Sequence, residues 1–211
     1  KATLERLKYA AARNRLKKLA RGVYASVPPG VDAAKFQPDR FLVAAALRTD
    51  AVFSHHSALE LLGAAHSDWR LCTAYSGKRS QPFDVDGLEL RFLSHPQSLV
   101  RHQAVDLGIR SVHRLDRELS VTGPERTLID GFRRPDLVGG LAEFVESAAG
   151  FSVLELPLLF KLLEDFGQKR LWAAVGWFLD TYRTTFYVSD DDLALIGKQV
   201  PKEPLYLAKD Q

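Results

Sequence analysis

Strand-like runs and amphipathic helices occupy different parts of this chain, and this separation constrains its fold more than any other feature. Short runs with strand character recur in the middle, at 69–75, 88–93, 109–113 and 119–121. The last third instead repeats its apolar residues at helical spacing, with Leu159, Leu162, Leu163 and Phe166 on one predicted helix and Leu171, Ala174, Val175, Phe178 and Leu179 on the next. The order predicts an α+β fold, in which a mainly antiparallel or mixed sheet with helices is followed by a helical C-terminal third.

The N-terminal residues predict a small module of their own. An apolar stripe from Leu4 to Ala11 predicts a short basic helix, and residues 15–27 predict two strands around an Arg-Gly pair. A helix followed by a basic hairpin is the second half of a winged helix, whose helix enters the major groove while its hairpin lies along phosphates. We therefore expect a partial winged-helix module at 1–30 and a second domain at 31–211.

Positive charge is concentrated in this module. Residues 1–22 carry eight basic side chains and one acidic one, whereas the rest of the chain carries a net charge of −4, for a total of +3. Clustered Lys and Arg release counterions when they meet phosphates, so the pattern favours a nucleic-acid contact; the alternative is a solvated basic helix. The side chains expected to bind DNA are Thr3, Arg6, Arg13, Arg15, Lys17, Lys18 and Arg21.

Several local patterns predict where helices begin. The expected caps are Asp39 for the helix after it, Ser54 for a helix over 55–62, the capping box Thr122-Gly-Pro-Glu125 for a helix to about Phe132, and Ser189 with its three following aspartates for the last helix. A further helix is predicted over 137–148. There Gly139 and Gly140 each cost about 1 kcal/mol relative to Ala, which indicates close packing.

Composition excludes several classes of protein. The chain is 46% hydrophobic and 26% charged, as is typical of a globular protein rather than a disordered or disulfide-built one. No stretch approaches the roughly 18 uninterrupted apolar residues of a membrane helix, and no signal-peptide pattern is visible. The single cysteine, Cys72, has no partner for an internal disulfide. We expect a cytoplasmic protein that does not associate with membranes.

No group of residues has the pattern of a known reaction or metal site. Two groups come closest: His55, His56, His66 and Cys72, and the pair Glu125 and Asp130. The spacing of the first group fits no zinc site, and the two carboxylates project to different faces of one predicted helix. Neither a nucleophile elbow nor a phosphate-binding glycine loop is present. We therefore predict no enzymatic activity, no cofactor and no metal.

Five segments of the chain, taken in order, carry a family resemblance. They are LKKLARGVYASVP at 16–28, DAVFSHHSALELLGAAHS at 50–67, VTGPERTLIDGFRRPDLVGGLAEFVES at 121–147, WAAVGWFLD at 172–180 and PKEPLYL at 201–207. Together they resemble the AbiEi family, the antitoxins of type IV toxin-antitoxin (abortive-infection) systems. The likeness extends over most of the chain.

The resemblance implies a function and two partners. Family members join an N-terminal winged helix, which binds inverted repeats in their own promoter, to a larger C-terminal antitoxin domain, and they act as transcriptional autorepressors. The implied partners are double-stranded DNA, bound by a homodimer, and a nucleotidyltransferase-like toxin. That toxin is usually counteracted without a stable complex, although relatives neutralise it directly. This chain departs from the family pattern because it begins inside the winged helix.

Two questions stay open in the sequence. Because the C-terminal domain of relatives can help to bind DNA, Arg126, Arg133 and Arg134 are candidates for secondary phosphate contacts; the other interpretation is that they form salt bridges with Asp130 and Asp136. The alternative function is a protein-binding module that directly sequesters the toxin, with the basic module incidental.

Overall fold

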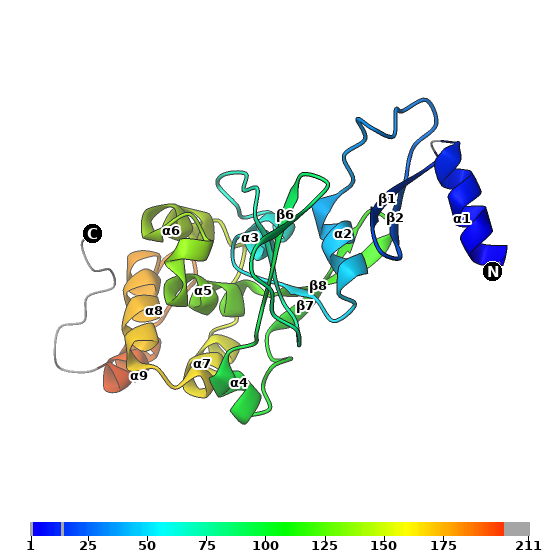
Figure 1. Cartoon of the computed structure of the whole chain (residues 1–211). Helices are drawn as coiled ribbons and strands as arrows, with labels where there is room; N and C mark the ends of the chain where they lie inside the picture. Colours follow the sequence, from blue (N-terminus) through cyan, green and yellow to red (C-terminus); the bar gives the residue numbers. More distant parts are fainter. Residues whose placement is uncertain (1, 14, 201–211) are drawn as a thin grey trace.

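The chain has an α+β fold, as the sequence predicts. The computed structural model describes residues 2–13 and 15–200, and Figure 1 shows three parts in sequence order: a helix with a hairpin at one end, a sheet in the middle, and a group of helices at the other end. Within the described residues, no helix is long and apolar enough to cross a membrane.

The N-terminal helix and hairpin form as predicted. Helix α1 spans Ala2–Ala12, and strands β1 (Leu16–Ala20) and β2 (Val23–Ser26) pair antiparallel. The turn between them contains Gly22, whose φ of +82° is a conformation that glycine adopts without a steric penalty. The helix stop expected at Asn14 lies outside the described residues.

A six-stranded mixed sheet forms the middle of the molecule. Its strands are β3 (Val52–Phe53), β4 (Cys72–Tyr75), β5 (Phe83–Val85), β6 (Leu88–Leu93), β7 (Ile109–Arg114) and β8 (Arg117–Thr122), in the spatial order β5-β6-β4-β3-β8-β7. The pairs β3–β8 and β4–β6 are parallel, and the other three pairs are antiparallel. The predicted mixed sheet is confirmed, although the three-residue strand β5 was not expected.

Helices bury two separate cores. Helix α2 (Arg40–Leu47) packs on one face of the sheet, where Phe41, Phe53 and Phe92 are buried together and Leu19 of the hairpin joins them. A larger core lies among the remaining helices α3 (His56–Leu61), α4 (Gln97–Arg101), α5 (Pro124–Arg133), the 3₁₀ turn η1 (Pro135–Leu137), α6 (Leu141–Ala149), α7 (Leu156–Phe166), α8 (Lys169–Thr181) and α9 (Asp190–Gln199). The core faces predicted for α7 and α8 are buried, which confirms the helical C-terminal third.

Two of the predicted helix caps are confirmed. The Asp39 carboxylate accepts hydrogen bonds from the backbone N–H groups of Phe41 and Leu42 at 2.9 and 3.0 Å. Ser189 and Asp192 form a reciprocal capping box at the start of α9, since each side chain accepts a hydrogen bond from the backbone N–H of the other. The acidic start of α9 is therefore structural.

The cap expected at Ser54 is wrong. The N-cap residue of α3 is His55, and the Ser54 backbone N–H instead continues the pairing with β4 by donating to the Thr73 carbonyl at 3.2 Å. The Ser54 hydroxyl bonds the His55 ring and so does not cap the helix.

The capping box expected at Thr122 and Glu125 is also wrong. Gly123 is the N-cap of α5, and the Thr122 hydroxyl bonds the Thr127 hydroxyl at 2.8 Å. The Glu125 carboxylate accepts from Arg110 at 3.1 Å and from the Glu155 backbone N–H at 2.9 Å, so residues distant in sequence bind the carboxylate that was expected to cap the helix.

The helix predicted over 137–148 begins later than expected. Gly139 and Gly140 have φ values of +84° and +89° and form a turn between η1 and α6, which starts only at Leu141. These glycines serve a change of chain direction, because positive φ is the conformation that glycine alone adopts freely. The expected close packing is found at Gly139, where an added methyl group would overlap the side chain of Glu143, but not at Gly140.

Candidate functional site

The exposed cations of the N-terminal module lie at one end of the molecule. Helix α1 and the β1–β2 hairpin project from the body in Figure 1, and the side chains of Arg6, Arg13, Arg15, Lys18 and Arg21 are all exposed. The Arg13 guanidinium lies 4.4 Å from the centre of the Tyr9 ring, and that ring is 58% exposed. The side chain of Thr3 lies outside the described residues.

Lys17 differs from the other predicted DNA-binding residues. Its Nζ donates to the Phe36 carbonyl at 2.8 Å and lies 2.6 Å from the Asp86 carboxylate in the β5–β6 turn. Successive residues of a strand point to opposite faces, so Lys18 points outward where Lys17 points inward. Lys17 therefore ties the hairpin to the body.

The three arginines considered for secondary phosphate contacts, Arg126, Arg133 and Arg134, are divided between the core and the surface. Arg126 is fully buried: its guanidinium donates to the carbonyls of Val105 and Leu107, and lies 5.4 Å from the centre of the Tyr75 ring. A phosphate on the molecular surface is out of its reach. Arg133 and Arg134 form the salt bridges that were the alternative interpretation of the sequence. Arg133 lies 3.4 Å from Asp130, and Arg134 lies 2.6 Å from Asp136.

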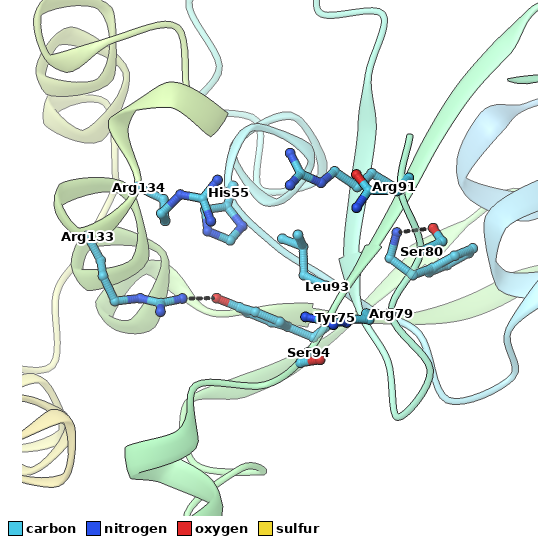
Figure 2. Close-up of a pocket in the computed structure, with 11 residues that line it drawn as sticks. His55, Tyr75, Arg79, Ser80, Arg91, Leu93, Ser94, Arg133 and Arg134 are labelled. Carbon is cyan, nitrogen blue, oxygen red and sulfur yellow. Dashed lines mark hydrogen bonds between the residues drawn. The ribbon is translucent and has the colours of Figure 1, made fainter. Parts of the chain in front are cut away.

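Arg133 and Arg134 also face a cavity that the sequence did not predict. This cavity has a volume of about 490 Å³ and lies between the ends of β4 and β6, the loop after β4 and the end of α5 (Figure 2). Its lining residues are His55, Tyr75, Arg79, Ser80, Gln81, Arg91, Phe92, Leu93, Ser94, Arg133 and Arg134. Four of the described lining residues are arginines and none is acidic. We call it the arginine cavity.

The register of the sheet explains why polar residues meet here. In the parallel pair β4–β6, Thr73 lies beside Arg91 and Tyr75 beside Leu93, so these four side chains share one face of the sheet. Ala74 and Phe92, at the positions between them, belong to the core under α2. The sequence did not predict Arg91 as a site residue, because an arginine in a strand of alternating residues fits a solvent-exposed face as well as the wall of a cavity.

His55 is held in the wall of the arginine cavity in an unusual backbone conformation. Its φ of 57° and ψ of −132° lie in a region that residues other than glycine rarely adopt, at a cost of about 1–3 kcal/mol. The side chain is fully buried, its Nδ1 is 2.9 Å from the Ser54 hydroxyl, and its Nε2 has no hydrogen-bond partner among the described residues. Burial lowers the pKa of His55 to about 4, so the ring is neutral at pH 7.

Tyr75 orients Arg133 toward the same space. The Tyr75 hydroxyl donates to the Asp130 carboxylate at 2.8 Å and accepts from the Arg133 guanidinium at 2.9 Å, a contact drawn in Figure 2. Burial raises the pKa of Tyr75, which keeps the phenol protonated. Its ring lies against those of His55 and His95, with centroids 5.5 and 5.2 Å away, so the hydroxyl is fixed in position.

The other titratable residues singled out from the sequence are packed in the interior or lie at the surface. His56 stacks on Trp69 with ring centroids 4.9 Å apart, and its Nδ1 lies 2.9 Å from the Glu60 carboxylate. Burial raises the pKa of Cys72 to about 12, so it is present as a thiol. His66 lies at the surface, 3.7 Å from Glu146. Among the described residues, no three His, Cys, Asp or Glu side chains are grouped so that they could hold a metal ion.

Comparison with known proteins identifies the fold. No protein-family model and no curated protein matches the chain. It is similar to the crystal structure of the RV2827C protein from Mycobacterium tuberculosis, at 19% sequence identity and a TM-score of 0.58, over 95% of this chain and 74% of that chain. The two proteins share a fold. At this level of identity, the likeness extends to the fold alone.

The buried His55 makes stability sensitive to mild acid. Its pKa is about 4 in the folded protein and close to the ordinary 6.5 in the unfolded chain, so below pH 6.5 only the unfolded chain takes up the proton. Stability is therefore lost as the pH falls from 6.5 towards 4. Between pH 7 and pH 5 we expect urea unfolding to report a loss of about 2 kcal/mol that the His55→Asn variant does not show. Identical pH profiles for the two proteins would contradict this assignment.

Proposed function

We propose that this chain is a DNA-binding transcriptional regulator and antitoxin of the AbiEi type, and that α1 and the β1–β2 hairpin contact the DNA. One observation carries the proposal: Arg6, Arg13, Arg15, Lys18 and Arg21 are exposed together at one end of the molecule. Among the described residues, no carboxylate lies within ion-pair distance of any of them. Cations without a carboxylate partner among the described residues are available to neutralise phosphates.

The two elements are suited to different parts of a DNA duplex. A helix of the size of α1 fits the major groove, where base edges are read, and the outward side chains Lys18 and Arg21 of the hairpin suit the flanking phosphates. The Arg13–Tyr9 pair presents a cation stacked on an exposed ring on α1. In this arrangement α1 determines which DNA sequence is bound, and the hairpin contributes affinity for DNA of any sequence.

The remaining parts of the proposal rest on the likeness of the sequence to AbiEi antitoxins. In it, the protein binds inverted repeats upstream of its own gene as a homodimer, represses that gene, and counteracts a nucleotidyltransferase-like toxin in the cytoplasm. The body of the chain acts by binding and not by catalysis.

A salt titration tests the DNA contact. We propose to measure binding of the full chain to the duplex upstream of its own gene at increasing salt concentration, for the unmodified protein, Lys18→Ala, Arg21→Ala and Lys17→Ala. Each phosphate contact contributes about 0.9 to the slope of log K against log salt. Lys18→Ala and Arg21→Ala should each reduce the slope by about one unit, whereas Lys17→Ala, which removes a lysine already paired with Asp86, should leave it unchanged.

The adjacent lysines make this test selective. Equal slopes for all four proteins would place DNA binding elsewhere on the chain, and an equal reduction by Lys17→Ala and Lys18→Ala would show that the hairpin does not bind in this orientation. Absence of DNA binding, together with stable co-purification of the product of the neighbouring gene, would favour direct sequestration of the toxin.

A further inference from the structure

The arginine cavity holds more positive charge than its surroundings neutralise. Arg133 and Arg134 have carboxylate partners in Asp130 and Asp136. Within residues 2–13 and 15–200, by contrast, the side chains of Arg79 and Arg91 form no hydrogen bond or ion pair, and the Nε atom of Arg91 is buried. A half-buried guanidinium without a partner is costly, so a positively charged cavity of this kind is suited to an anion.

His55 in the wall of the same cavity has a buried ring nitrogen without a partner among the described residues. The Ser54 hydroxyl has no other partner among the described residues, so its proton is free to point to Nδ1 of His55 at 2.9 Å. The neutral ring then carries its own proton on Nε2, the buried atom without a partner. His55 and Arg134 both line the cavity drawn in Figure 2, and the partner of Arg134, Asp136, is exposed.

We propose that the arginine cavity binds a diphosphate group, either as free pyrophosphate or as the phosphate chain of a nucleotide. The two unpaired guanidinium groups of Arg79 and Arg91 leave a local charge of about +2, which matches the two or more negative charges of a diphosphate. A volume of about 490 Å³ is within the range of small-molecule sites.

Shape separates this site from the proposed DNA contact. The arginines of this site line a cavity whose wall includes the fully buried His55, so a ligand must be compact enough to enter the cavity to meet them together. The phosphates of a duplex lie on a convex surface and meet exposed cations, such as those of the hairpin. The assignment is independent of the proposed function, because the cavity and the hairpin share no residue.

Calorimetric titration of the full chain tests the proposal. Magnesium-free solutions of pyrophosphate, adenosine triphosphate and inorganic phosphate are titrated into the unmodified protein and into Arg79→Gln, Arg91→Gln and Arg101→Gln. Arg79 is exposed on a loop, so its replacement leaves folding intact. Arg101 is an exposed arginine of α4 outside the cavity lining, and its replacement removes the same charge as a matched control.

We expect one site per chain that prefers pyrophosphate and adenosine triphosphate to inorganic phosphate. Arg79→Gln and Arg91→Gln should each weaken binding by about tenfold or more, since each removes a charge-assisted hydrogen bond, whereas Arg101→Gln should change it less than twofold. Equal affinity for pyrophosphate and adenosine triphosphate would mean that the cavity recognises the phosphates alone. Tighter binding of adenosine triphosphate would mean that the cavity also contacts its base and sugar.

Two outcomes would overturn the proposal. These are no binding of pyrophosphate or adenosine triphosphate, and equal weakening of binding by Arg101→Gln and the two cavity variants. Lys18→Ala, the variant that tests the DNA contact, should bind pyrophosphate with unchanged affinity. The DNA contact is therefore tested by Lys18→Ala and Arg21→Ala, and the diphosphate site by Arg79→Gln and Arg91→Gln, so that failure of either proposal is seen separately.

Discussion

Replacement of Asp130 by alanine should destabilise the protein by about 3–5 kcal/mol, the largest effect we expect from a single charged residue. Asp130 is fully buried, accepts a hydrogen bond from Tyr75, and lies 3.9 Å from the buried Arg126 and 3.4 Å from Arg133. Removing the carboxylate leaves Arg126 buried without its counter-charge. Urea unfolding followed by circular dichroism measures the change.

The neighbouring pair supplies the control. Asp136 also pairs with an arginine, Arg134 at 2.6 Å, but is exposed to solvent, so Asp136→Ala should cost less than about 1 kcal/mol. Similar losses in the two variants would mean that burial does not set the strength of these pairs, and that Arg126 draws its stability from its carbonyl contacts and from the Tyr75 ring.

Gly131→Ala should destabilise the protein by about 3 kcal/mol, although alanine is the better helix former. Gly131 lies within α5, and a methyl group there would overlap the ring of Phe144 on α6. That ring is itself buried and packed edge-on against Phe132, with centroids 5.2 Å apart, so it has little room to move. The overlap therefore outweighs the gain in helix propensity.

The same substitution in α9 should have the opposite sign. Gly197 has nothing within 4 Å of the position of an added methyl group, so Gly197→Ala should stabilise the protein by about 1 kcal/mol. Thermal unfolding of the two variants measures the contrast. A stabilised Gly131→Ala protein would show that α5 and α6 can separate at little cost.

Much of the fold was predictable because its signals are local. The hairpin follows from two short runs around an Arg-Gly turn, and the core faces of α7 and α8 follow from apolar residues at helical spacing. The caps at Asp39 and Ser189 use donors and acceptors within three residues, which is why the sequence predicts them correctly.

The features that were missed depend on contacts between distant segments. The carboxylate of Glu125 could not be assigned from its own helix, because Arg110 and the backbone of Glu155 bind it. The arginine cavity takes residues from the turn after β3, the sheet and α5, and no spacing in the sequence connects them. Alternation predicts that Lys17 and Lys18 point in opposite directions, but only Asp86 decides which of them points inward.

The sheet pairings also set the order in which paired strands become available along the growing chain. The hairpin pairs residues no further apart than Leu16 and Ser26, whereas the central parallel pair joins Val52 to Ser120 across 68 positions. Closing the longer loop costs more entropy and must wait for synthesis of β8. All residues that pair in the basic hairpin are thus synthesised before the strands that close the sheet, and the cavity, which needs two arginines from beyond β8, can form only after both segments have been made.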